Sequence, residues 1–227
     1  MIRQVLTAAV LAGIAGGFLV SAFQSVRVIP LVLEAETFEA AGPATAAGHV
    51  GEGAEHREGA WAPAEGLERT VYTVLTNVLT AIGFALVLAA CFALERSVDW
   101  RRGVLWGLAG FAVFHLAPAL GLPPELPGTS AAPLFERQAW WLATVAATAA
   151  GLALVVFAPR RAVKALGIVL IVAPHAVGAP EAQAPGGLVP AELAAEFAAA
   201  SLVTAAAFWV ALGGLTGFFF RRLAAGA

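Results

Sequence analysis

Cysteine is nearly absent from this chain, since Cys91 is the single one among 227 residues. An internal disulfide framework and a CxxC-type site are therefore excluded. Charged residues are also scarce, at 12% of the chain against 60% hydrophobic residues, which is not the composition of an ordinary soluble domain. The sequence also lacks a basic tract, so we expect no nucleic acid partner.

Several catalytic signatures are missing as well. The sequence contains no G-x-x-x-x-G-K-[ST] for nucleotide phosphates, and no H-E-x-x-H, G-x-S-x-G or C-x-x-C-H. This excludes ATP hydrolysis by a Walker mechanism, the commonest membrane proteases and hydrolases, and c-type haem sites. We expect a protein that is not an enzyme and that holds no tightly bound cofactor.

The chain has long apolar runs instead, close to the roughly 20 residues that cross a bilayer as a helix. Only a helix satisfies its own backbone over such a stretch of lipid, so the predicted fold is all-α: one integral membrane domain, residues 1–227. The first run resembles a signal peptide, but its apolar character continues to Leu33, which favours retention. Six spans are predicted, at residues 5–29, 70–94, 103–120, 138–158, 162–178 and 196–220. A re-entrant fifth segment would leave five.

The charges between the spans are segregated by sign. Nine of the thirteen basic residues fall on one side, which the positive-inside rule places in the cytoplasm with both termini. The other side receives thirteen of the fifteen acidic residues, most of them in a long outer loop, residues 34–69. An anionic outer face would concentrate cations. The nine basic residues are Arg3, Arg96, Arg101, Arg102, Arg160, Arg161, Lys164, Arg221 and Arg222.

An internal repeat links the even-numbered spans. With Glu68 aligned to Glu136, ERTVYTVLTNVLTAIGFALVL runs against ERQAWWLATVAATAAGLALVV without a gap. The last span begins in a similar way at Glu196, although this third copy is weak. We therefore predict tandem helical hairpins: two related copies, and three around a pseudo-threefold axis if the weak third copy belongs to the pattern. The alternative is a chance match of alanine, leucine and glycine. In transporters with repeats of this kind, substrate sites lie at the repeat interface.

The odd-numbered spans end alike, each at a proline followed by an acid. The stretches are 114–128, 171–187 and the region from Pro30 to Glu34, and we interpret them as one functional rim. His115 and His175 lie near the ends of the third and fifth spans, and neutral imidazole binds divalent first-row metals. Each histidine could equally be a hydrogen-bonded residue between helices. Carboxylates that could add ligands nearby are Glu125, Glu181, Glu34 and Glu36.

The long outer loop contributes two more candidate metal ligands, His49 and His56, among acids and glycines. Such a loop could collect a metal ion loosely, and it is equally what a solvated loop looks like.

Several segments together resemble the CbtA family. They are LEAE (33–36), WAPAEGLERT (61–70), LAPALGLPPELPG (116–128), RQAWWLAT (137–144), APHAVGAP (173–180), VPAELAAEFAAASL (189–202) and RRL (221–223). The family is a membrane subunit predicted to import cobalt in bacteria for cobalamin synthesis, beside a small single-span, histidine-bearing partner called CbtB. The resemblance implies motif positions for His175, Glu125, Trp140 and Trp141. The family is described with five spans and often with a histidine-rich first outer loop, whereas this chain offers only His49 and His56 there.

The sequence therefore predicts a multi-pass permease subunit of the bacterial inner membrane that transports Co²⁺, or the related Ni²⁺. Two alternatives stay open, a non-transporting accessory subunit of a membrane complex and a membrane protein that binds haem between His115 and His175. A homo-oligomer is compatible with the sequence.

Overall fold

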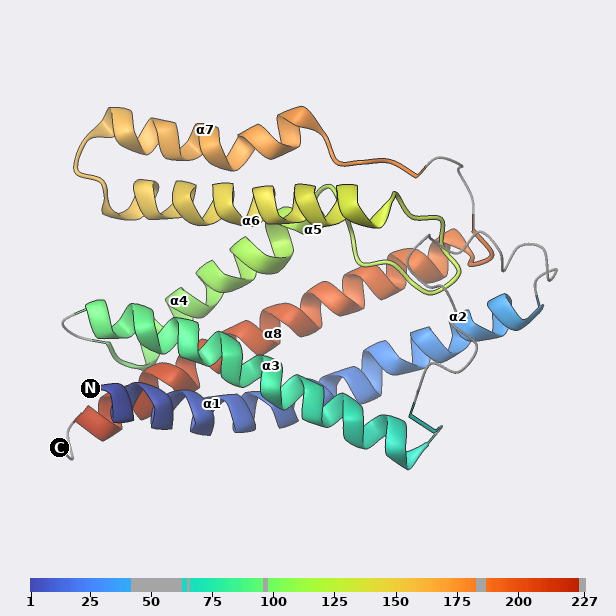
Figure 1. Ribbon diagram of the computed structural model, residues 1–227, viewed down its shortest axis with the longest axis horizontal. Coiled ribbons are helices and arrows are strands. Elements are labelled where there is room, and N and C mark those ends of the chain that lie inside the picture. The colour runs from blue at the N-terminus through green and yellow to red at the C-terminus, as the bar shows by residue number, and fades with distance from the viewer. Residues whose placement is uncertain (42–62, 65, 96–97, 183–186, 225–227) are drawn as a thin grey trace. The chain divides into compact units, whose positions relative to one another are not determined.

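The computed structural model describes residues 1–41, 63–64, 66–95, 98–182 and 187–224, and its regular elements are helices (Figure 1). Six continuous helical segments occupy the six predicted spans, and the all-helical fold of a polytopic membrane protein is confirmed. The first comprises α1 (Ile2–Phe23), η1 (Gln24–Val28) and α2 (Ile29–Ala41), and the second is α3 (Leu67–Leu94). The third comprises α4 (Trp100–Phe111), η3 (Ala112–Leu116) and α5 (Ala117–Ala119), followed by α6 (Leu134–Phe157), α7 (Arg161–Val177) and α8 (Ala191–Ala224).

Four of these segments are individually long and apolar enough to cross a membrane, among the residues that the structure describes. They are Ile2–Ala41, Leu67–Leu94, Leu134–Phe157 and Ala191–Ala224. The first segment continues as helix well beyond its predicted end at residue 29, because α2 runs to Ala41. Most of the predicted outer loop, residues 42–62 and 65, lies outside the described residues.

Two π-helical turns interrupt the first and third segments at matching places. Gln24–Val28 precedes Pro30, and Ala112–Leu116 precedes Pro118 with the same spacing. Proline has no N–H to donate and its ring clashes with the carbonyl four residues earlier, so a widened turn before it relieves the conflict. Arg27 and His115 both stand three residues before their proline. π-Helical turns of this kind often mark functional sites.

The chain folds into two compact units, each assembled from segments distant in the sequence. Unit 1 comprises Met1–Arg27, Gly59–Phe111 and Val203–Ala227. In it α1 packs closely on α3, because a Cβ atom at Gly13 would lie only 2.5 Å from Ile82 Cα, and one at Gly17 only 2.5 Å from Val78 Cα. Small residues at such contacts let helices approach in lipid, where packing drives association.

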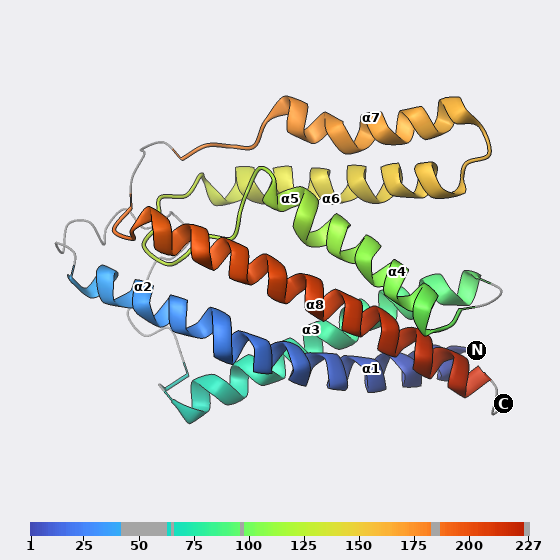
Figure 2. The same cartoon turned by 180° about the vertical axis from the view of Figure 1, so that it is seen from behind.

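Unit 1 also gathers both chain ends. The Gln4 side-chain Nε2 atom donates to the Phe220 carbonyl oxygen at 2.8 Å, and the start of α1 and the end of α8 are neighbours in both views (Figures 1 and 2). A Cβ atom at Gly217 would lie 2.6 Å from the Asp99 carbonyl oxygen. The basic clusters around Arg3, Arg101 and Arg221 therefore share one end of this unit.

Unit 2 comprises Val28–Glu58 and Ala112–Leu202. Its helices α6 and α7 form an antiparallel pair in both views (Figures 1 and 2). Gly151 and Gly167 bring the two backbones together, since a Cβ atom at Gly151 would lie 2.5 Å from the Gly167 carbonyl oxygen.

The ends of three segments meet in unit 2. Leu31 and Ala35 of α2, Leu126 of the proline-rich loop and Leu193 of α8 form a buried apolar cluster. The Leu188 amide donates to the Gly128 carbonyl oxygen at 3.1 Å, beside a bridge between Thr129 and Gly187. We call this assembly the rim: α2, residues 120–133 and residues 187–193. Parts of all three sequence stretches interpreted as one rim are in contact here.

Candidate functional site

His175 stands near the end of α7, directly after Pro174. Its Nε2 atom is buried and has no hydrogen-bond partner in the part of the chain that the structure describes. The imidazole ring and the Trp140 indole form a T-shaped contact, with ring centroids 5.9 Å apart and an interplanar angle of 68°. A buried nitrogen without a partner loses its bond to water and gains none in return, so such a group calls for an explanation.

The Trp140 indole is fixed from several sides. Its Nε1–H donates to the Pro174 carbonyl oxygen at 3.3 Å. On another side lies Gly121, where a Cβ atom would come within 2.5 Å of the indole Cη2 atom. The indole thus joins α6, the end of α7 and the loop that follows α5.

Glu125 lies in the proline-rich loop and forms an ion pair with Arg137 of α6, 3.3 Å between Oε2 and Nη2. The loop and the first turns of α6 enclose a groove of about 820 Å³. The groove wall is largely apolar, and its polar groups are Glu125, Arg137, Gln138 and Thr129. The Glu125 carboxylate is therefore compensated by a cation of the protein itself.

The remaining predicted ligands are distributed along the chain. His115 is a half-buried residue of the π-helical turn Ala112–Leu116. Glu34 is exposed and Glu36 half-buried, both on α2, and Glu181 is exposed after α7. His49 and His56 lie outside the described residues. Among the residues described, no group of three or more His, Cys, Asp or Glu is close enough to hold a metal ion.

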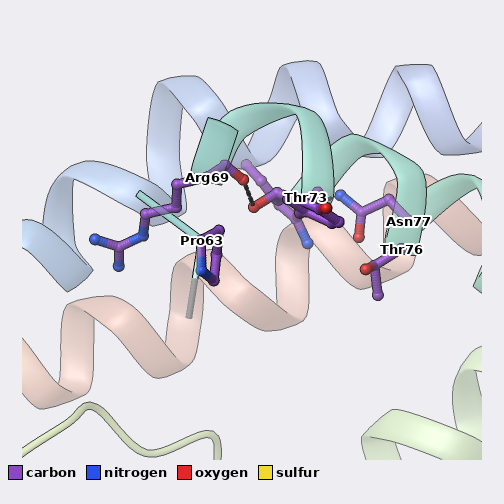
Figure 3. Close-up of a pocket in the computed structure, with 7 residues that line it drawn as sticks. Pro63, Arg69, Thr73, Thr76 and Asn77 are labelled. Carbon is purple, nitrogen blue, oxygen red and sulfur yellow. Dashed lines mark hydrogen bonds between the residues drawn. The ribbon is translucent and has the colours of Figure 1, made fainter. Parts of the chain in front are cut away.

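A second pocket, of about 340 Å³, lies in unit 1 and was not predicted from the sequence (Figure 3). It is lined by Gln24, Pro63, Arg69, Tyr72, Thr73, Thr76 and Asn77. The Asn77 Nδ2 atom donates to Ser21 Oγ at 3.0 Å and to Gln24 Oε1 at 2.6 Å, which connects α3 to α1 and η1. The one signal for it in the sequence was the presence of Gln24 and Asn77 in otherwise apolar spans.

The threonines shared by the repeats have different environments. Thr76 and Thr80 of α3 are exposed, whereas Thr144 and Thr148 of α6 are buried. The Thr144 hydroxyl donates to the Trp140 carbonyl oxygen at 2.9 Å. The Thr148 hydroxyl is buried without a hydrogen-bond partner among the described residues.

The chain matches the family model described as "Probable cobalt transporter subunit (CbtA)" over residues 2–221. No curated protein and no solved structure matches it.

Proposed function

Because the chain belongs to the CbtA family of probable cobalt transporter subunits, we propose that it forms the membrane path by which Co²⁺, or the related Ni²⁺, enters a bacterial cell. It acts as a permease subunit and not as an enzyme, and the imported cobalt supplies cobalamin synthesis. The metal ion is the cargo, and no resident cofactor takes part.

The observation that carries this proposal is the buried, unpartnered Nε2 atom of His175. A neutral imidazole nitrogen is a good ligand for divalent cobalt and nickel. Leaving such an atom buried without a partner costs about 1–3 kcal/mol. A passing metal ion that accepts its lone pair would remove that cost, whereas a lipid tail would not.

The charges of the chain support the direction of transport. The shared end of unit 1 at Gln4 and Phe220 carries basic clusters and faces the cytoplasm by the positive-inside rule. Glu34, Glu36 and Glu181 attract the hydrated cation on the other side of the membrane.

His175, with His115 of the third span, then replaces part of the water shell of the ion. Glu125 contributes only after Arg137 releases it, because the two are paired at 3.3 Å. Cation and guanidinium therefore compete for this carboxylate. His49 and His56 of the outer loop would capture the metal loosely before it reaches the rim.

A small single-span subunit of the CbtB type is the proposed partner, in the cytoplasmic membrane and with both termini of this chain in the cytoplasm. With few histidines in its own outer loop, this chain would rely on that partner for metal capture. The permease could also associate with further copies of itself.

The test is uptake of radiolabelled Co²⁺ at micromolar concentration in cells that express the chain alone or with the partner. We expect His175→Ala to lower uptake about tenfold or more, since metal affinity depends this strongly even on residues that only orient ligands. Val177→Ala is the matched control, because it truncates an exposed side chain two residues along the same helix. Immunoblots of the membrane fraction check that the protein amounts are equal.

Uptake that is unchanged in His175→Ala would remove this residue from the path. No uptake with the protein present in the membrane would refute the permease and favour an accessory subunit. The visible absorption spectrum of the purified protein then decides whether His115 and His175 bind haem.

A further inference from the structure

We infer that Trp140 is the positioning residue that keeps His175 Nε2 buried, oriented and free to bind the transported metal ion. This inference rests on the proposed function. It adds a residue whose role lies outside the metal ligands themselves and which acts through His175.

The first step of the argument is the hydrogen bond from Trp140. An indole has one donor and no acceptor, and here the Nε1–H is directed to the Pro174 carbonyl oxygen at 3.3 Å. The same oxygen accepts the Gly178 amide at 3.1 Å. The donor therefore fixes the backbone beside His175 and leaves the imidazole nitrogen unbonded, so a metal ion need not displace it.

The second step is the contact between the two rings. The indole and the imidazole form a T-shaped contact with 5.9 Å between centroids and 68° between planes, a favourable arrangement of aromatic rings. A bulky neighbour at this place limits the rotamers of His175. Orientation fixed before binding reduces the entropy lost when the metal ion is bound.

The third step is what holds the indole itself. A side chain at position 121 would clash with the indole, because a Cβ atom built on Gly121 would lie 2.5 Å from Cη2 and 2.8 Å from Cζ2 of Trp140. That atom would also lie 2.8 Å from the Ala179 Cβ. Gly121 thus lies against both the indole and the chain after α7, and it leaves no space for a side chain between them.

The repeat provides an internal comparison. With Glu68 aligned to Glu136, Tyr72 takes the place of Trp140, and it is 41% exposed. Trp140 is half-buried and in contact with His175, which distinguishes this position of α6 from the exposed aromatic position of α3. This favours a role tied to His175.

The experiment is a titration of the purified full chain in detergent with Co²⁺, followed by calorimetry and by the visible absorption bands of bound cobalt. Trp140→Phe keeps a ring and removes the N–H donor. We expect the dissociation constant to rise about tenfold, as for other residues that orient metal ligands. Trp106→Phe, which removes the indole donor to Glu95 Oε2 at 2.9 Å in unit 1, is the matched control and should change it less than twofold.

A double-mutant cycle separates positioning from general stabilisation. In a His175→Ala background, Trp140→Phe should have almost no further effect on cobalt affinity, because it acts through that imidazole. Gly121→Ala, which displaces the indole without altering it, should reproduce the loss in the native background. Trp140→Phe and Gly121→Ala should both leave the far-ultraviolet circular dichroism of the protein unchanged.

Equal losses with and without His175 would show that Trp140 stabilises the fold and does not position the ligand. An unchanged affinity in Trp140→Phe would overturn the inference while leaving the metal site intact. If the native chain binds no Co²⁺ and imports none, the proposed function fails, and this inference fails with it.

Discussion

Helices α3 and α6 carry aligned copies of one sequence pattern but pack in different ways. Gly151 of α6 packs directly on Gly167 of α7, because a Cβ atom built on Gly151 would lie 2.5 Å from the Gly167 carbonyl oxygen. A Cβ atom built on its counterpart Gly83 would meet nothing within 4 Å outside its own helix, among the described residues. In the α1–α3 pair the glycines of close approach belong to the partner helix, at Gly13 and Gly17.

The polar groups of the two pairs differ in the same way. Asn77 of α3 bonds across to Ser21 and Gln24, whereas the aligned residue of α6 is Val145. In its place α6 presents Trp140 to Pro174 and His175. The same sequence pattern thus forms a hydrogen-bonded helix contact in unit 1. In unit 2 it forms a glycine-mediated helix contact together with the packing of Trp140 on His175. A shared sequence pattern in α3 and α6 therefore does not determine how each helix contacts its neighbouring helix.

The largest expected effect tests the two aligned glycines. Gly151→Ala should destabilise the protein by about 2–3 kcal/mol, because the new methyl group is forced against backbone atoms and the helices must separate. Gly83→Ala should be neutral or stabilising by up to about 1 kcal/mol, since alanine is the better helix former in open space. Unfolding in mixed detergent micelles, followed by circular dichroism, measures both. Equal effects at the two sites would contradict the difference in packing.

A smaller effect tests the polar contact of unit 1. Asn77→Ala removes both hydrogen bonds to α1 and η1 and should cost about 1–2 kcal/mol, in line with interhelical hydrogen bonds in membranes. Thr80→Ala, one turn along α3 at an exposed position, is the control and should change stability little. If both substitutions cost the same, the Asn77 bonds contribute nothing beyond the side chain itself.

The six helical segments could be predicted from the sequence because apolar length is a direct requirement of the bilayer. The grouping of the rim segments could also be predicted from the sequence, because Pro30 and Pro118 each mark the end of an apolar run. The π-helical turns were not predicted. A π-helical turn adds one residue to a helical turn without changing the apolar run, so the proline that follows is its only signal in the sequence.

The candidate site could be predicted only residue by residue. His175 was proposed from its type and place, but its contact with Trp140 depends on α6 and α7 being neighbours, which the local sequence does not show. The ion pair of Glu125 with Arg137 likewise depends on the proline-rich loop lying against α6, which was not predicted. The pocket around Asn77 was missed because its residues, taken singly, resemble ordinary packing positions of a span.

The smallest expected effect concerns helix starts outside the spans. Asp99 precedes α4, and its Oδ1 atom accepts the Arg102 amide at 2.9 Å. This backbone hydrogen bond, aided by the charges of Arg221 and Arg101, lowers the pKa of Asp99 below its ordinary 3.8, against a partial opposing effect of desolvation. In unit 2, the N-cap residue of α7 is Arg160, whose side chain makes no capping hydrogen bond.

Because the folded pKa is below the unfolded one, the contribution of Asp99 is present above pH 3.8 and is lost as the pH falls through the folded value. Asp99→Asn keeps a capping oxygen but cannot titrate. Its stability should therefore decrease less than that of the native chain when unfolding is measured between about pH 5 and pH 3. Arg160→Gln should follow the native pH dependence. Identical profiles for the native chain and Asp99→Asn would show that the α4 cap is not the group that titrates.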